Sequence, residues 1–159
     1  SNFIGTGLFY VQEKKFNNQF LKLKFSSHLS PYATYRPTLL GYSFSERIFK
    51  DYNGQTYWIT IDFNTKVQEK FKLFKYINLA LGYSIDGFTG ARYNPNLNCV
   101  ECNNLRRQSQ YLLSFDLDLT EIETKNKFLK LFLNTFSIIK FPAPTVIIQK
   151  ENQFKWLYF

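Results

Sequence analysis

Two carboxylates, two residues apart, are the side chains whose type and spacing could do chemistry. Asp116 and Asp118 lie in the segment QYLLSFDLDLT, residues 110–120. Paired carboxylates act as acid and base or nucleophile in glycoside hydrolysis. However, His28 is the only histidine, and no set of nucleophile, base and orienting group accompanies the pair. We therefore predict a protein that is not an enzyme, in which both carboxylates are solvated, salt-bridged or part of a polar interior.

The two cysteines, Cys99 and Cys102, form a C-x-x-C motif in the segment NPNLNCVECNNL. A closed zinc site would need two further ligands, and one histidine cannot complete it. A thioredoxin-like motif would sit at a strand-to-helix junction, whereas this pair lies in an Asn-rich loop. We predict a small disulfide formed in an oxidising compartment, with two free thiols as the alternative. No metal and no cofactor are predicted.

Alternation of apolar and polar residues is the main structural signal. In residues 110–120 the apolar Tyr111, Leu113, Phe115 and Leu117 alternate with Ser114, Asp116 and Asp118, which indicates a strand. The same period recurs in residues 21–26, 40–48, 57–63 and 77–84, and less cleanly in NFIGTGLFYV, TVIIQ and FKWLYF. Asn53-Gly54 predicts a hairpin turn between two of these segments. The pattern predicts an all-β fold of about eight antiparallel strands.

One segment, TEIETKNKFLKLFLNTFSIIKFPAP, has helical periodicity instead. Thr120 and Glu123 have the spacing of a capping box, and two prolines close the segment, so we predict one amphipathic helix near residues 121–140. Such a helix either packs on a sheet or lies in a membrane interface. In the second case Lys127 and Lys130 would meet headgroups, and Phe132 and Phe136 would face acyl chains.

The composition sets further limits. The 159 residues include 18 Phe, 11 Tyr and no Met, and the net charge is +8. We predict a single β-rich domain over residues 1–159, forming the C-terminal part of a longer precursor. A basic chain attracts anionic partners, and no nucleic-acid-binding motif is present. No apolar run is long enough for a transmembrane helix.

The alternating strands could meet either lipid or a protein core. As a small outer-membrane-type β-barrel, the fold would place Tyr57, Phe63, Tyr83 and Tyr111 near the membrane interface. Its interior would hold a polar network that includes Arg47, Asp62, Asp116 and Asp118, with Lys22 and Lys24 among the polar strand residues and Ala80 and Gly82 leaving room. A soluble antiparallel sheet with one wet face gives the same alternation.

Several stretches resemble a known family, among them KDYNGQTYW, SFDLDLT and SNFIGTGLFYVQE. They are similar to the C-terminal part of an uncharacterised Gram-negative family described as predicted periplasmic lipoproteins. The resemblance covers essentially the whole chain and implies an envelope location, with no known activity and no residue roles to carry over.

We therefore expect a structural or assembly protein at the outer membrane or its periplasmic face. Its partners would be outer-membrane lipid and other envelope proteins, and not nucleic acid. The alternative is a soluble periplasmic β-rich domain that binds a lipid or a partner protein.

Overall fold

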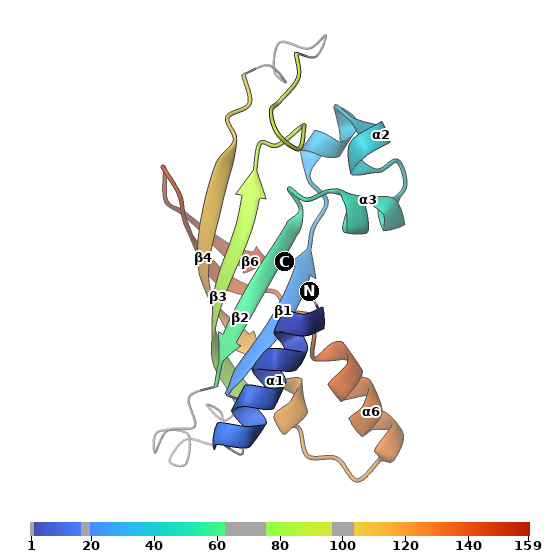
Figure 1. The fold of residues 1–159 in the computed structure, drawn as a ribbon, viewed down its shortest axis with the longest axis vertical. Coiled ribbons are helices and arrows are strands. Elements are labelled where there is room, and N and C mark those ends of the chain that lie inside the picture. The colour runs from blue at the N-terminus through green and yellow to red at the C-terminus, as the bar shows by residue number, and fades with distance from the viewer. Residues whose placement is uncertain (1, 17–19, 63–75, 97–103) are drawn as a thin grey trace.

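A computed structural model describes residues 2–16, 20–62, 76–96 and 104–159. Its centre is one antiparallel sheet in which each strand pairs with its sequence neighbours, in the order β1 to β6 (Figure 1). The strands are β1 (Leu21–Ser27), β2 (Gln55–Ile61), β3 (Ile77–Asp86), β4 (Gln108–Leu117), β5 (Ala143–Ile148) and β6 (Gln153–Tyr158). The prediction of a mostly β, antiparallel fold is confirmed.

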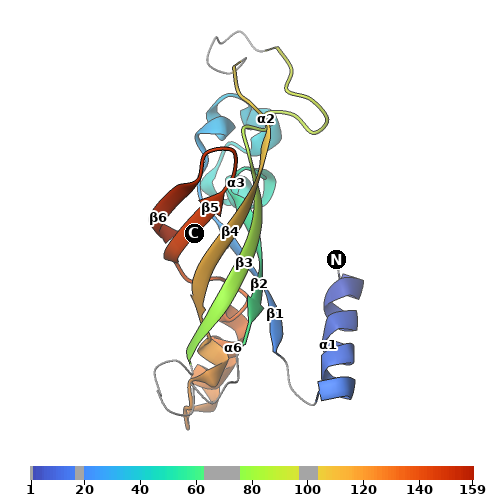
Figure 2. The same ribbon diagram turned by 90° about the vertical axis from the view of Figure 1, so that its left-hand side faces the viewer.

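Short helices lie at the two ends of the sheet. The helices α2 (Pro37–Leu40) and α3 (Phe44–Lys50) lie beyond the end of β1 and follow a 3-10 helix, η1 (Pro31–Thr34). At the other end are α1 (Asn2–Phe16), the 3-10 helix η3 (Leu119–Glu121) and α6 (Lys127–Phe136). Figure 2 shows α1 standing to one side of the sheet and the β5–β6 hairpin turned to the opposite side.

The predictions of eight strands and of a closed barrel are not supported, because two expected strands are helices and the sheet is open. The segment NFIGTGLFYV lies in α1. The segment TLLGYSFSERIF forms α2 and α3, separated by Gly41 at a φ of 103°. Pro37 starts α2, and the Ser43 hydroxyl accepts a hydrogen bond from the Glu46 amide to cap α3. These helix-start signals override an alternation that fits a strand equally well.

Two local predictions also need correction. The turn at Asn53-Gly54 joins α3 to β2 and does not close a hairpin. The amphipathic helix spans Lys127–Phe136 and is shorter than the predicted 121–140. Its cap is Asn126, whose side chain accepts hydrogen bonds from the amides of Phe128 and Leu129, whereas Thr120 belongs to η3.

The first edge of the sheet, along β1, is covered by the chain itself. Phe25 donates its amide hydrogen to the Ile138 carbonyl at 2.8 Å and accepts from the Lys140 amide at 2.9 Å. Further along, the Gln12 carboxamide accepts from the Leu21 amide at 2.7 Å and donates to the Leu21 carbonyl at 3.0 Å. This side chain therefore bonds β1 as a neighbouring strand would.

The apolar core is small. It consists of Trp58, Ala80, Leu112, Ile147 and Tyr158, all from the strands. Gly82 lies opposite Trp58 in the sheet, and a Cβ atom at Gly82 would come within 2.7 Å of the indole ring. Among the described residues, sixteen polar or charged side chains are buried against eight hydrophobic ones. A soluble domain buries mostly apolar residues, so this ratio is inverted.

Candidate functional site

The sheet has one apolar face that is exposed, which we call the outer face. Strand pairing aligns its side chains in cross-strand rows. One row is Leu23, Ile59, Leu81, Leu113, Val146 and Phe154; the next is Leu21, Ile61, Leu79 and Phe115; Ile77 and Leu117 follow. Tyr111, at one limit, and Leu117 are six residues apart on β4, so these rows cover about 20 Å along the strand.

An aromatic row closes the outer face at the end nearer to α2 and α3. It runs from Phe25 through Tyr57 and Tyr83 to Tyr111, and each residue is the direct cross-strand partner of the next. The ring centroids are 5.7 Å apart for Phe25 and Tyr57 and also for Tyr83 and Tyr111. Tyr57 and Tyr111 are about 60% exposed, and the Tyr57 hydroxyl donates to the Gln55 side chain at 3.0 Å.

The sequence singled out three members of this row, Tyr57, Tyr83 and Tyr111, and the structure places them side by side. The fourth candidate, Phe63, lies outside the described residues, as do Cys99 and Cys102 of the predicted disulfide.

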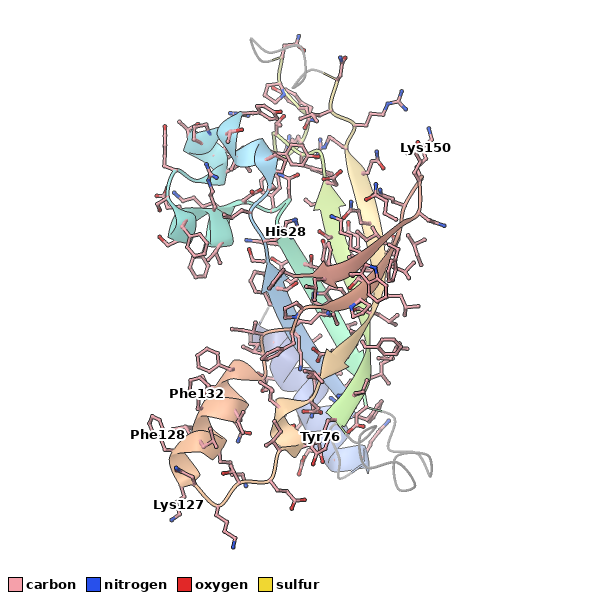
Figure 3. All side chains as sticks on the ribbon, turned by 180° about the vertical axis from the view of Figure 1, so that it is seen from behind. His28, Tyr76, Lys127, Phe128, Phe132 and Lys150 are labelled. Atoms are coloured by element: carbon pink, nitrogen blue, oxygen red, sulfur yellow. The ribbon has the colours of Figure 1, made fainter. Side chains whose placement is uncertain are left out.

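Helix α6 has no buried residue and is exposed on its polar and apolar sides alike. Asn134 and Ser137, at its C-terminal end, line a groove of about 610 Å³ that α6 shares with α1 and β1. Three phenylalanines spaced four residues apart are exposed: Phe128, Phe132 and Phe136. The ring centroids of Phe132 and Phe136 are 4.2 Å apart. Figure 3 shows Phe128 and Phe132 pointing away from the sheet, with Lys127 at the start of the helix. Lys130 is exposed as well.

The other face of the sheet, the inner face, carries a buried ion pair. Lys24 of β1 pairs with Asp116 of β4, and both side chains are at most 1% exposed. The Lys24 ammonium also donates to the Leu117 carbonyl at 3.0 Å, and Asp116 accepts from the Phe141 amide at 3.4 Å. An ion pair this far from solvent is stabilised only when such additional hydrogen bonds satisfy both charges.

A second network surrounds Asp118, just beyond the end of β4. Its carboxylate accepts from Lys22 at 2.5 Å, from Asn78 at 3.0 Å and from the Thr120 amide at 3.0 Å. Burial by itself raises the pKa of Asp118, but the hydrogen bonds from Lys22, Thr120 and Asn78 outweigh it and hold the pKa below its usual value. Asp118 is therefore a charged structural anchor.

Lys140 extends this polar interior and was not anticipated from the sequence. Its ammonium lies 4.4 Å from the centre of the Trp58 ring, a cation–π contact, and donates to the Phe141 carbonyl at 3.0 Å. The Trp58 indole N–H in turn donates to Ser26 at 2.9 Å. Lys140 follows an exposed apolar stretch, and nothing in that local pattern marks it as buried.

The other two predicted interior residues, Asp62 and Arg47, have different surroundings. Asp62 lines the groove between α1, β1 and α6, next to Lys22. Arg47 belongs to α3, beyond the opposite end of the sheet. The expected interior network of four residues is thus centred on Asp116 and Asp118, with Lys24 and Lys22 as their partners.

A separate polar cluster fixes the α2–α3 end and was missed in the sequence. The buried Asp51 carboxylate accepts from the Ser30 hydroxyl at 2.6 Å and from the Asn53 amide at 3.2 Å. Asn53 also accepts from the Phe88 amide at 2.7 Å. The signal was available, since an Asp side chain commonly accepts a hydrogen bond from the backbone amide two residues further on.

No cluster of three or more metal-ligating side chains occurs in the described part of the chain. Within these residues, each helix is too short or too polar to cross a membrane. A second, apolar crevice of about 410 Å³ lies where β4 and β5 diverge, lined by Ile77, Phe115, Leu117, Phe141, Pro142 and Pro144 among others.

The geometry is thus a sheet with an apolar, aromatic-edged outer face and a charged, hydrogen-bonded inner face. Comparisons of the chain with protein-family models, with curated proteins and with solved structures give no match.

Proposed function

We propose that this protein is a non-enzymatic component of the outer membrane, where the outer face of its sheet contacts lipid and its role is structural or in assembly. The observation that carries the proposal is the inverted burial of the sheet. Its polar residues, such as Lys24 and Asp116, are buried, whereas Leu113 and Phe115 are exposed.

The energetic reason concerns the solvent of the outer face. Each Å² of apolar surface held in water costs about 25 cal/mol relative to an apolar environment. Soluble proteins rarely expose a contiguous apolar patch beyond a few hundred Å². An outer face of twelve apolar side chains in adjacent rows, besides its aromatic row, is therefore favourable against acyl chains and unfavourable in water.

The limits of the outer face support the same placement. Membrane β-sheets have an apolar band edged by aromatic residues at the interface, which matches the row of Tyr57, Tyr83 and Tyr111. At the opposite end, α6 exposes phenylalanines on one side and lysines near its start, as helices lying in a membrane interface do. In this arrangement Lys127 and Lys130 meet headgroups, while Phe132 and Phe136 enter the acyl region.

The test uses adjacent residues on opposite faces. The starting chain has serine in place of Cys99 and Cys102. A single cysteine is then introduced as Leu113→Cys or as Ser114→Cys and labelled with an environment-sensitive fluorophore. Each labelled protein is reconstituted in lipid vesicles. We expect a quencher carried on the acyl chains to quench the label at 113 strongly and the label at 114 weakly. Equal, weak quenching at both positions would contradict the proposal.

Fractionation of cells that express the full chain provides an independent check. We expect the protein to stay with outer membranes after a carbonate wash. A heat-dependent mobility shift on a denaturing gel would add that the sheet belongs to a closed, barrel-like unit in the membrane.

A soluble periplasmic domain that binds a lipid or partner protein is the second candidate. The apolar crevice between β4 and β5 favours it, since it could hold an apolar group. Release by carbonate together with weak quenching at position 113 would favour this candidate.

A further inference from the structure

We propose that the second edge of β6 receives an antiparallel strand from a different β-sheet membrane protein. The choice of a different protein over a second copy rests on the proposed function, because it depends on a fixed orientation in the membrane.

The two edges of the sheet are treated differently by the chain. The β1 edge is bonded at Leu21 by the Gln12 side chain and at Phe25 by residues 138 and 140. In contrast, β6 pairs with β5 on one side, and no described strand pairs with its other side. Figure 2 shows β6 at the margin of the sheet. Among the described residues, the chain therefore covers the β1 edge at Leu21 and Phe25, whereas no strand covers the second edge of β6.

The sequence of β6 protects its second edge only in part. Natural edge strands carry prolines, several charges or inward-pointing charged residues. The strand QFKWLY has no proline, but Lys155 places one charge on its inner side, and its pairing with β5 shifts by one residue between Lys155 and Tyr158, which leaves the extra residue in β6. Trp156 is 75% exposed and Leu157 68% exposed. An exposed, apolar edge strand is a template for strand addition.

The membrane strengthens this argument. Water can satisfy the unpaired amide and carbonyl groups of an edge, but lipid cannot, and open sheet edges do not occur within the hydrocarbon region. If the outer face contacts lipid, the backbone groups along the β6 edge need a hydrogen-bonding partner.

A second copy of this chain cannot supply that partner. Its β1 edge is already bonded, so only its β6 edge is available. Antiparallel pairing of two β6 edges requires a two-fold axis normal to the sheet, which would insert the two copies in opposite directions across the membrane. Parallel pairing of the same edges would place the apolar faces on opposite sides. Neither arrangement continues one lipid-facing surface, so the partner strand does not come from a second copy.

The register of β6 defines the chemistry of the partner strand. Phe154 lies beside Val146 on the outer face, so the residue opposite Phe154 should be apolar. Lys155 lies beside the buried Thr145 on the inner side, so the residue opposite Lys155 should be polar or acidic. The partner therefore supplies a strand with alternating apolar and polar residues.

Cross-linking in intact cells tests this pairing. A photoreactive phenylalanine analogue replaces Gln153, Lys155 or Leu157, one position at a time, in the full chain. The matched control is the same replacement of Tyr83, an exposed residue of β3 whose two edges are both paired. Mass spectrometry then identifies the attached residue.

We expect positions 153 and 155 to attach to one partner chain. The two attached partner residues should lie two positions apart on a single strand, in the order opposite to that of 153 and 155. Position 83 should give no such adduct. An adduct with a second copy, an adduct without that reverse order, or no adduct in a protein retained by membranes would each overturn the proposal. If carbonate releases the chain and the ordered adducts persist, strand addition stands and the membrane placement fails.

Discussion

Leu113 and Ser114 are neighbours on β4, yet they belong to opposite environments. The Leu113 side chain is 38% exposed in the apolar outer face, whereas Ser114 is 3% exposed and bonded to Thr145 and to the Pro144 carbonyl. The inner face thus behaves like the interior of a polar cavity, and the outer face like a core without its covering layer. The contrast teaches that the alternation sorts residues by face, whereas burial depends on what surrounds each face.

The largest expected effect comes from breaking the inner-face ion pair. Lys24→Met leaves the buried Asp116 charge unpaired and should lower the free energy of unfolding by about 3–5 kcal/mol. The double variant Lys24→Met with Asp116→Leu should recover most of that loss. Urea unfolding of the reconstituted protein measures both. A single variant as stable as the double one would show that the pair is not buried.

A charge on the outer face should act only when lipid is present. Leu113→Arg, in the middle of the apolar rows, should cost about 2–4 kcal/mol in lipid vesicles, with Leu113→Ile as the near-neutral control. In water the arginine would be solvated and the cost small. The free energy of unfolding of each variant is measured in vesicles and in aqueous buffer. If Leu113→Arg lowers it equally in both, the outer face does not contact lipid.

Crowding of the inner face should give a smaller loss. Gly82→Ala places a methyl group against the Trp58 ring and should cost about 1–3 kcal/mol, because the indole has to shift. Adding Trp58→Phe should relieve part of this strain. If Gly82→Ala is as stable as the original chain, the contact between position 82 and the ring is looser than the structure has it.

The smallest expected effect is a pH dependence at the end of the inner face. Burial, and next the nearby Lys155 charge, lower the pKa of His28 from its ordinary 6.5. The folded protein then prefers the neutral imidazole, so the unfolded chain binds more protons and stability falls as the pH drops below about 6.5. His28→Gln should flatten this part of a stability–pH curve. An unchanged fall in the variant would assign the effect to another group.

Much of the sheet could be predicted from period two alone. Strands β2, β3 and β4 alternate over long runs, so the face of Tyr57, Leu81 or Asp116 follows directly. The segment TLLGYSFSERIF alternates as well, but local helix-start residues, Pro37 and Ser43, determine its structure. Alternation is necessary for a half-buried strand but not sufficient for one.

The pairings across the inner face lay beyond sequence reasoning. Lys24 and Asp116 could be assigned to the polar side of their strands, but their partnership depends on how the curled sheet brings β1 towards β4. Lys140 is buried because residues 138 and 140 bond to β1, a contact between segments far apart in the chain. Neither relation leaves a local signal.

The meander has a consequence for the order of folding. Each strand bonds to its neighbours in sequence, so the sheet can grow one strand at a time, although only the connection between β5 and β6 is short. The bonds between Phe25 and residues 138 and 140 are the exception, because they join parts of the chain more than a hundred residues apart. We expect these bonds to form late, after β1 to β4 have paired, and to fix β1 against residues 138–140. Weakening these late bonds should speed unfolding while leaving the folding rate nearly unchanged.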